Sequence, residues 1–493
     1  MKKFTACVIG SGPGGYVAAI RLAQLGVSVC VVEREHLGGI CLNWGCIPTK
    51  ALLKSAEVFH SIKKSQEYGI TIDDNILKSI KPDLSKIIDR SRGVAAKLSN
   101  GIAMLMKKNK IEVISGQASF KSSNEISVTK FVSKEICGLK SNPVIPTLSD
   151  IETISADYFI IATGARAREI KGFEPDGNLV LTYKEAMSQK TLPQKLLVVG
   201  SGAIGIEFAS FYNTVGSNVT VFEMLDRIVP SEDLEISKLA EKYYKSQGLN
   251  IHTSINLISF VKNKNSITVE YKLSNGEVKK DEFDKIIMAV GVVPNTDKIS
   301  IENTKVKKDD KGIVITDKYL QTNDEKIFAI GDVTTGPWLA HKASHEGIVA
   351  AEKIASKLKL YDESKIHPIN RTNIPGCIYT NPQIASVGLT EQKAKELGYD
   401  IKVGRFSPAG NGKAIATNKI EGLVKTIFDK KTGELLGAHL IGGDVTEYIS
   451  AFLVGKTMEG TDLDFISTIF PHPTLSEMIH ESVLDSNGRV IHI

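Results

Sequence analysis

A strand, a glycine-rich loop, a helix and a second strand that ends in glutamate are indicated twice in this chain of 493 residues. Apolar runs that end in glycine, separated by a stretch with helical spacing, predict such a βαβ unit. Glu33 lies 23 positions after Gly10, and Glu223 lies 23 positions after Gly200. Because each unit pairs parallel strands through a helix, we expect an α/β fold with two related domains. The expected elements are residues 4–9, 16–25 and 28–32 in the first copy and 196–200, 203–215 and 218–222 in the second.

The first glycine loop, Gly10-Ser-Gly12-Pro-Gly-Gly15, fits the G-x-G-x-x-G pattern between a strand and a helix. Its glycines let backbone N–H groups approach a pyrophosphate at the positive end of the helix. Glu33 ends the next strand, where a carboxylate accepts hydrogen bonds from an adenosine ribose. A tight turn that binds nothing is the alternative, but the strand, helix and acid together favour a dinucleotide site.

The second loop, Gly200-Ser-Gly202-Ala-Ile-Gly205, meets the same conditions, with Glu223 as its acid. The sequence therefore predicts two Rossmann-like dinucleotide-binding domains. Met224 follows Glu223, so no arginine stands where a 2′-phosphate would bind. This pattern favours NAD over NADP at the second site.

Two of the six cysteines, Cys41 and Cys46, lie close together. Four intervening residues allow their sulfurs to come within bonding distance at the start of a helix near Ala51, whose positive end would favour a thiolate. A zinc site would need a second close Cys/His pair, so no metal is expected. Inert core thiols are the other alternative, and they fit Cys7 and Cys30 on the apolar strands better.

Overall composition excludes several classes of protein. The net charge is +5, from 61 basic and 56 acidic residues, and the lysines are scattered, which argues against nucleic-acid binding. No apolar run approaches the roughly 20 residues that span a bilayer, and an apolar strand from Phe4 leaves no room for a signal peptide. Six cysteines are too few for a disulfide framework, so we expect a cytoplasmic location.

Outside the two βαβ units the patterns are weaker. A helical stretch is predicted at residues 51–109, followed at 121–150 by a hairpin with a surface insertion. From about residue 369 no third nucleotide loop occurs, which indicates a separate C-terminal domain. Its apolar helix at 448–458 would pack inside one chain or against a second. Further strands are expected at 267–271, 285–290 and 326–330.

The segment Gly38-Gly-Ile-Cys41-Leu-Asn-Trp-Gly-Cys46-Ile-Pro-Thr-Lys50 resembles the redox-active disulfide signature of the pyridine-nucleotide disulfide oxidoreductases. Four further motifs of that family occur in the family's order across nearly the whole chain. They are Ile161-Ala-Thr163-Gly164-Ala165, Ala289-Val-Gly291-Val-Val-Pro294-Asn295, Thr322 through Ile330-Gly331-Asp332, and Phe470-Pro-His472-Pro-Thr-Leu-Ser-Glu477. The resemblance implies FAD at the first nucleotide site and NAD at the second.

The resemblance also implies roles for residues around the flavin. Cys41 resembles the thiol that exchanges with substrate, and Cys46 the thiol that faces the flavin ring. Lys50 resembles the lysine beside the flavin's reactive nitrogen, and Glu207 its ion-pair partner. Thr163 and Gly164 would line the crossing to the NAD domain, Gly291 the return from it, and Gly331 and Asp332 the flavin ribitol site.

His472 resembles the general base for the substrate thiol, and Glu477 the carboxylate that orients its ring. A neutral imidazole is well suited to take a thiol proton near pH 7, and a carboxylate fixes its tautomer. In this family the histidine reaches the disulfide of the other subunit, so a homodimer is implied.

The implied domain order has four parts. An FAD-binding domain covers 1–165, an NAD-binding domain covers 166–288, the chain returns to the FAD-binding and central region at 289–360, and an α+β dimerisation domain covers 361–493.

Within the family, Glu223 and a C-terminus without cysteine resemble the NAD-linked members that oxidise dihydrolipoamide, with lipoyl domains of 2-oxo acid dehydrogenase complexes as partners. NADP-linked reduction of a glutathione-like disulfide is the first alternative. A structural or nucleotide-sensing subunit with vestigial catalysis is the second. Two features depart from the family pattern: Trp44, where many relatives carry valine, and a long segment at 132–149.

Overall fold

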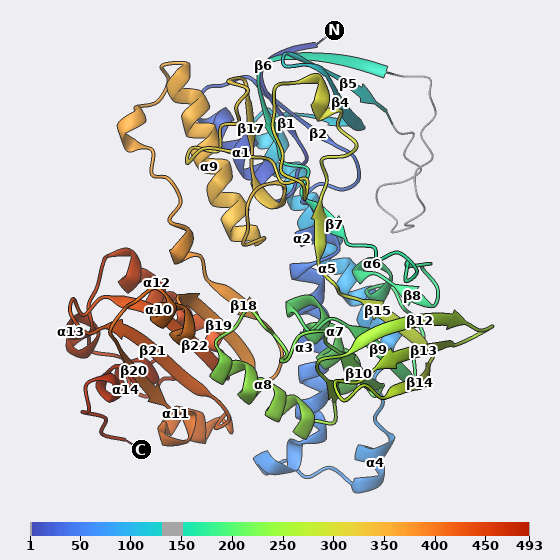
Figure 1. Ribbon diagram of the computed structural model, residues 1–493, viewed down its shortest axis with the longest axis vertical. Coiled ribbons are helices and arrows are strands. Elements are labelled where there is room, and N and C mark those ends of the chain that lie inside the picture. Colours follow the sequence, from blue (N-terminus) through green and yellow to red (C-terminus); the bar gives the residue numbers. More distant parts are fainter. Residues whose placement is uncertain (1, 131–150, 493) are drawn as a thin grey trace. The chain divides into compact units, whose positions relative to one another are not determined.

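The computed structural model describes residues 2–130 and 151–492, so the insertion expected at 132–149 lies outside the described residues. The chain divides into two units (Figure 1). This division into two units does not test the four predicted domains, so the four-part domain order stays a prediction. The first unit comprises Met1–Ala51, Ile88–Arg168 and Val292–Ile369, and the second comprises Leu52–Ile87, Glu169–Gly291 and Asn370–Ile493.

A seven-stranded sheet forms the centre of the first unit. Strand β1 lies between β2 and β6, β3 lies beyond β2, and β17 pairs with β6, all in parallel. The hairpin of β4 and β5 joins antiparallel to β6, which confirms the hairpin expected before the insertion. The elements are β1 (Lys2–Ile9), α1 (Pro13–Gln24), β2 (Val29–Glu33), α2 (Gly39–Asn43), α3 (Cys46–Lys63), α5 (Leu84–Lys108), β3 (Glu112–Ser115), β4 (Gln117–Ser122), β5 (Glu125–Thr129), β6 (Ile151–Ile161), β7 (Ala165–Ala167), β16 (Val292–Pro294), β17 (Ile327–Ala329) and α9 (Ala340–Lys357), of which α3 and α5 continue into the second unit.

Strand β1 contributes to apolar clusters on both faces of this sheet, because successive side chains of a strand point in opposite directions. Ala6 and Val8 pack with apolar residues of α1 and α9, whereas Cys7 and Ile9 pack with residues of β4 and β5. Cys7 lies opposite Cys30 of β2, and both are fully buried, so their assignment to the core is confirmed. The hydrogen bond with Cys30 and burial raise the pKa of the Cys7 thiol.

The second unit contains a parallel sheet in the order β11-β10-β9-β15-β8 and two antiparallel sheets, β12-β13-β14 and β18-β19-β22-β21-β20. The parallel sheet carries the second βαβ unit. The elements are α4 (Asp74–Ser79), β8 (Val180–Leu181), α6 (Tyr183–Ala186), β9 (Lys195–Val199), α7 (Ala203–Thr214), β10 (Asn218–Phe222), α8 (Leu234–Ser246), β11 (Asn250–His252), β12 (Asn256–Lys262), β13 (Ile267–Lys272), β14 (Val278–Phe283), β15 (Lys285–Met288), β18 (Gly376–Ile378), β19 (Gln383–Gly388), α10 (Glu391–Glu396), β20 (Ile401–Phe406), α11 (Gly412–Ala416), β21 (Leu423–Asp429), β22 (Leu435–Gly442), α12 (Val445–Thr457), α13 (Asp462–Ser467) and α14 (Glu477–Ser486).

The helical stretch expected at 51–109 is confirmed, and it consists of separate helices, with the short α4 between α3 and α5. Helix α3 ends at Lys63 and α5 begins at Leu84. Gly69 adopts a left-handed conformation with φ of 75°, and Pro82 lacks the N–H that a helix interior requires. The apolar helix expected at 448–458 is present as α12, and it buries Ile449 and Phe452 inside the second unit.

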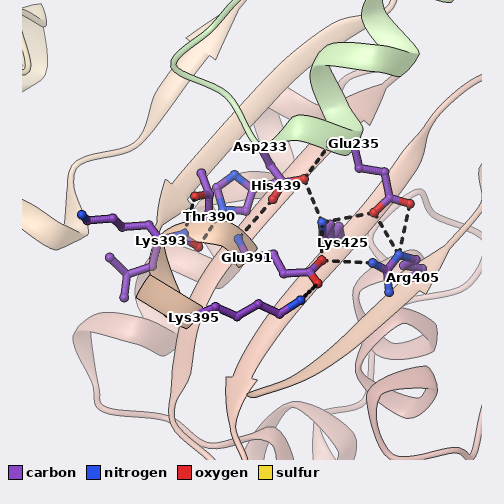
Figure 2. A network of polar contacts seen from close by, with 10 residues as sticks. Asp233, Glu235, Thr390, Glu391, Lys393, Lys395, Arg405, Lys425 and His439 are labelled. Carbon is purple, nitrogen blue, oxygen red and sulfur yellow. Dashed lines mark hydrogen bonds and ion pairs between the residues drawn. The ribbon is translucent and has the colours of Figure 1, made fainter. Parts of the chain in front are cut away.

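A buried ion-pair network ties α8 to the sheet of the C-terminal region within the second unit (Figure 2). The ammonium of Lys425 on β21 lies 2.8 Å from Asp233, 2.8 Å from Glu391 and 3.1 Å from Glu235. The Lys425 side chain is 3% exposed and that of Asp233 is 2% exposed. Asp233 also caps α8 by accepting from the Glu235 backbone N–H, and it accepts from the Glu391 N–H.

We expect Lys425→Met to lower the free energy of unfolding by about 3–5 kcal/mol, because Asp233 would remain buried without its cation. Urea denaturation of the two proteins measures this difference. Lys395→Met is the matched control, since Lys395 contacts Glu391 at 2.6 Å from a side chain that is 61% exposed. Equal losses in the two variants would contradict the role given to burial.

The network also makes stability depend on pH. Burial raises the pKa of Glu391, but bonds to Lys395 and Lys425 outweigh it and lower the pKa to about 2. The pKa of Asp233 is likewise held down, mainly by Lys425 against the effect of burial. This stabilisation is complete above the ordinary carboxylate pKa of about 4 and is lost as the pH falls through the lower folded-state values. We therefore expect unfolding free energy to fall more steeply below about pH 4 in the native protein than in Lys425→Met.

Candidate active site

The cysteine pair lies on two consecutive helices. Cys41 belongs to α2, and Cys46 is the first residue of α3, so that helix begins before Ala51. Gly38, with φ of 92°, allows the chain to enter α2 abruptly. Asn43 then holds α2 by donating to the carbonyls of Leu37 at 3.0 Å and Gly39 at 2.9 Å.

Both cysteines are present as thiols and are in hydrogen-bonding contact. That hydrogen bond and burial raise the pKa of Cys41, the charge of Lys50 lowers it, and the charge of Asp332 raises it further. The same interactions place Lys50 and Asp332 near the thiol pair within the first unit. Cys46 lies at the positive N-terminal end of α3, whereas Cys41 lies on α2. The expected stabilisation of a thiolate by this helix end stays a prediction.

The first glycine loop has the geometry that a pyrophosphate requires. A Cβ on Gly15 would lie 2.0 Å from the Gly10 carbonyl oxygen, whereas a Cβ on Gly12 would meet no atom within 4 Å. Gly12 precedes α1 without a side-chain cap, so no side chain at this position competes with an anion for the N–H groups of the first turn. The Glu33 carboxylate accepts from Ser11 N at 2.8 Å and Ser11 Oγ at 2.5 Å, which fixes the acid beside the loop.

The second glycine loop repeats this arrangement in the second unit. A Cβ on Gly205 would lie 1.9 Å from the Gly200 oxygen, and one on Gly202 would meet nothing within 4 Å. Glu223 accepts from Ser201 N at 2.9 Å and Ser201 Oγ at 2.6 Å. The residues therefore fit a second dinucleotide.

Arg227, the nearest arginine after that acid, is engaged elsewhere. It donates to Asp226 at 3.3 Å and to the Pro230 carbonyl at 3.1 Å. Its guanidinium is thus held by its own turn, which is consistent with a preference for NAD.

The crossing and return segments are bonded to each other. Thr163 Oγ1 donates to the Asn295 carbonyl at 2.7 Å, and Asn295 N donates to the Gly164 carbonyl at 2.9 Å. Beside them β7 and β16 pair antiparallel. Gly291, with φ of 99°, turns the chain at the end of the second unit.

A buried ion pair that was not predicted from the sequence holds the backbone of Gly331, the residue before Asp332. Lys342 and Glu346 of α9 lie 3.0 Å apart with side chains 0% and 1% exposed. Lys342 donates to the Gly331 carbonyl at 3.0 Å, and Gly331 N donates to Glu346 at 2.7 Å. Burial raises the pKa of Asp332, and Lys342 partly offsets this. A lysine and a glutamate four apart on the buried face of a helix were the available signal.

In the second unit the structure brings His472 and Glu477 together. His472 Nδ1 lies 2.8 Å from Glu477 Oε1, and the His472 side chain is 79% exposed. Burial would raise the pKa of Glu477, but bonds from Thr474 N and His472 hold it below its usual value. A neutral ring that donates from Nδ1 has Nε2 as its proton acceptor.

Glu207 is 5% exposed on α7, and its carboxylate accepts from the Tyr379 backbone N–H at 2.9 Å. It belongs to the second unit, whereas Lys50 and Cys41 belong to the first. The ion pair of Glu207 with Lys50, and the approach of His472 to Cys41, therefore stay predictions.

Among the helices of residues 2–130 and 151–492, none has the length and hydropathy of a membrane span. Within the same residues, no cluster of three or more His, Cys, Asp or Glu side chains is arranged to hold a metal ion.

Two nucleotide-binding loops and a close thiol pair on one chain define a nucleotide-dependent thiol oxidoreductase. Residues 4–347 match the family model described as pyridine nucleotide-disulphide oxidoreductase, and residues 374–483 match the dimerisation domain of the same family. The chain belongs to this family.

Individual proteins resemble the chain over its full length. It is 50% identical over 491 residues to a dihydrolipoyl dehydrogenase of Rhizobium etli, covering 100% of this chain and 99% of the relative. It is 46% identical over 491 residues to a dihydrolipoyl dehydrogenase of Zymomonas mobilis, covering 99% of both chains. A solved structure, the copper(II) complex of the HOCl-induced flavoprotein disulfide reductase RclA from Escherichia coli, matches with a TM-score of 0.83 and 27% identity over 98% of this chain and 99% of that one.

Proposed function

We propose that this chain is an FAD-dependent, NAD-linked dihydrolipoyl dehydrogenase that oxidises protein-bound dihydrolipoamide in 2-oxo acid dehydrogenase complexes. The observation that carries the proposal is the contact between the Cys41 and Cys46 thiols, with the charges of Lys50 and Asp332 acting on Cys41. Full-length similarity to dihydrolipoyl dehydrogenases supports the choice of substrate. A cytoplasmic location is part of the same proposal and rests on the small number of cysteines.

The proposed reaction begins with the oxidised Cys41–Cys46 pair. His472 takes the proton of one substrate thiol at Nε2, while Glu477 holds the ring through Nδ1. The substrate thiolate attacks Cys41 Sγ, the Sγ–Sγ bond breaks, and Cys46 leaves as the thiolate. The sulfur of the second substrate thiol then closes the lipoyl ring, the mixed disulfide with Cys41 breaks, and Cys41 leaves and takes up the proton of that thiol. Two electrons have thereby passed from the substrate to the protein.

The nucleotides would be held by the two glycine loops. Gly10, Gly12, Gly15 and Glu33 fit the adenosine end of FAD, and Thr163, Gly164, Gly331, Asp332 and Lys50 would hold its flavin end. Gly200, Gly202, Gly205 and Glu223 fit NAD, and Gly291 lies at the end of that domain. When bound, FAD supplies the two-electron relay between the thiol pair and NAD⁺.

A homodimer follows from the dimerisation domain, and the surface of that domain supports it. Large apolar side chains there are exposed, among them Ile469 at 95% and Met458 at 77%. Burial of such side chains against a second copy is favourable. We propose that the exposed His472 acts on the thiol pair of the partner.

The substrate is tested by comparing two reactions of the purified protein. We expect dihydrolipoamide with NAD⁺ to be turned over much faster than glutathione disulfide with NADPH. Dominant turnover of the second pair would reject the substrate. Bound flavin without any dithiol-linked turnover would instead favour a vestigial, structural subunit.

We expect Glu223→Gln to raise KM for NAD⁺ about tenfold and to reduce the preference over NADP⁺, because a neutral amide accepts ribose hydrogen bonds less well and no longer repels a 2′-phosphate. Steady-state kinetics with both nucleotides measure this change. Glu33→Gln, at the matching position of the first loop, is the control. It is expected to weaken flavin retention and leave KM for NAD⁺ unchanged, and a shift of that KM would contradict the assignment of the two loops.

A further inference from the structure

Within the first unit, side chains of helix α5 are hydrogen-bonded to the chain segment that carries the cysteine pair. Four of its side chains donate hydrogen bonds to backbone carbonyls of residues 37–51, the segment that contains both cysteines. The bonds run from Arg90 to Ala51 at 2.8 Å, from Ser91 to Pro48 at 2.9 Å, from Ser99 to Leu37 at 2.9 Å, and from Arg92 to Asn43. The start of α3 and the turn between the cysteines are thereby attached to a separate helix.

Arg92 is the unusual member of this group. It is 6% exposed, and its guanidinium carbon lies 4.4 Å from the centre of the Trp44 ring, which is itself 6% exposed. Among the described residues, its Nε and Nη1 have no hydrogen-bond partner. Burial lowers the pKa of Arg92 to about 10, so the side chain stays charged at neutral pH. Burial of a charge with so few bonds is unfavourable in general, which indicates a role other than stability.

Both groups that Arg92 contacts lie between the cysteines. Its Nη2 donates to the Asn43 carbonyl, and its guanidinium lies over the ring of Trp44. The negative face of an indole ring attracts a guanidinium, and more strongly when both are shielded from water. Asn43 and Trp44 are two of the four residues that join Cys41 to Cys46. Arg92 therefore restrains the turn that sets the separation of the two sulfurs.

We propose that Arg92 and Trp44 form a clamp that sets the equilibrium between the dithiol and disulfide forms of Cys41 and Cys46. The clamp rests on the proposed function only in treating these cysteines as a redox pair. Oxidation removes two electrons and two protons from the thiols and forms one Sγ–Sγ bond. When the turn is already restrained in the dithiol form, closing that bond loses little chain entropy, and the disulfide is favoured.

The positive charge of Arg92, taken alone, would have the opposite effect on the equilibrium between dithiol and disulfide. A nearby cation stabilises a thiolate, so its removal would favour the disulfide. The clamp predicts instead that loss of Arg92 favours the dithiol, because the turn becomes free to move. The geometry points to the clamp, since the guanidinium contacts the turn residues Asn43 and Trp44, while the charges that act on Cys41 include Lys50 and Asp332.

The test measures the disulfide fraction in the FAD-loaded protein. Native protein, Arg92→Met, Arg92→Lys, Trp44→Val and the Arg92→Met/Trp44→Val double variant are equilibrated in glutathione buffers, alkylated, and analysed by mass spectrometry. We expect each single variant to lower the equilibrium constant for the disulfide about tenfold, a potential about 30 mV less negative. Arg92→Lys is not expected to restore the native equilibrium, because an ammonium lacks the planar guanidinium that stacks on Trp44 and donates to Asn43 at the same time. The double variant should lose little more than either single variant.

Lys97→Met is the matched control, because it removes an exposed cation from the same helix, and we expect it to leave the equilibrium unchanged. Trp44→Val keeps the buried cation, so it tests the clamp even if Arg92→Met does not fold. An unchanged equilibrium in the Trp44 and Arg92 variants would overturn the clamp. A shift toward the disulfide in Arg92→Met with none in Arg92→Lys would replace it with an effect of charge. If the native protein formed no Cys41–Cys46 disulfide in any buffer, the proposed function itself would fail.

Discussion

Replacement of Cys46 by serine is expected to reduce dihydrolipoamide-linked NADH formation by at least about a thousandfold, because a hydroxyl cannot form or break the Sγ–Sγ bond that stores the electron pair. The fold should survive, since Cys46 is exposed at the start of α3 and the substitution changes one atom. Cys41→Ser should have a similar effect on turnover. Steady-state NADH formation measures both.

The two cysteine variants should differ in the absorption of the bound flavin. If Cys46 faces the flavin, Cys41→Ser retains a thiolate beside the ring and a pH-dependent flavin spectrum, whereas Cys46→Ser loses this dependence. Cys377→Ser is the matched control, because Cys377 is a half-buried cysteine on β18 and should keep full turnover. Substantial dithiol-linked turnover in Cys46→Ser would falsify the proposed redox pair.

Replacement of His472 by glutamine is expected to lower kcat/KM for dihydrolipoamide by about 10²–10⁴-fold, the usual contribution of a general base. The amide retains a donor toward Glu477 but cannot take a proton. The exposure of His472, at 79%, indicates that little stability is lost. Retention of flavin and an unchanged unfolding curve would separate this effect from misfolding.

Glu477→Gln tests the carboxylate that orients His472 separately from the base itself. Its carboxylate accepts from His472 Nδ1 and from Thr474 N, so the amide should weaken ring orientation without removing the base. We expect a loss of activity smaller than that of His472→Gln. At high pH the substrate is already a thiolate and no proton needs to be removed. The reaction rate of His472→Gln should therefore approach that of the native protein at high pH. A rate that stayed equally low at high pH would contradict the role as base.

Several parts of the fold could be predicted because their signals are local. The βαβ units were found because strand, glycine loop, helix and acid occur within one short stretch of chain. The burial of Cys7 and Cys30 followed from apolar runs alone. The helical stretch at 51–109 was predicted as a whole, but its division into separate helices was not, because helical spacing continues on either side of Pro82.

By itself the sequence determined the two nucleotide loops, their acids and the cysteine pair, since each depends on residue types at fixed short spacings that impose one backbone conformation. Only the tertiary structure decided which side chains that are distant in the sequence come into contact. Arg92 lies 49 positions from the Asn43 carbonyl it bonds, and Lys425 lies 192 positions from Asp233. Such contacts depend on how helices and sheets pack, and a buried charge whose partner is distant in the sequence gives no periodic signal, because that partner can lie anywhere in the chain.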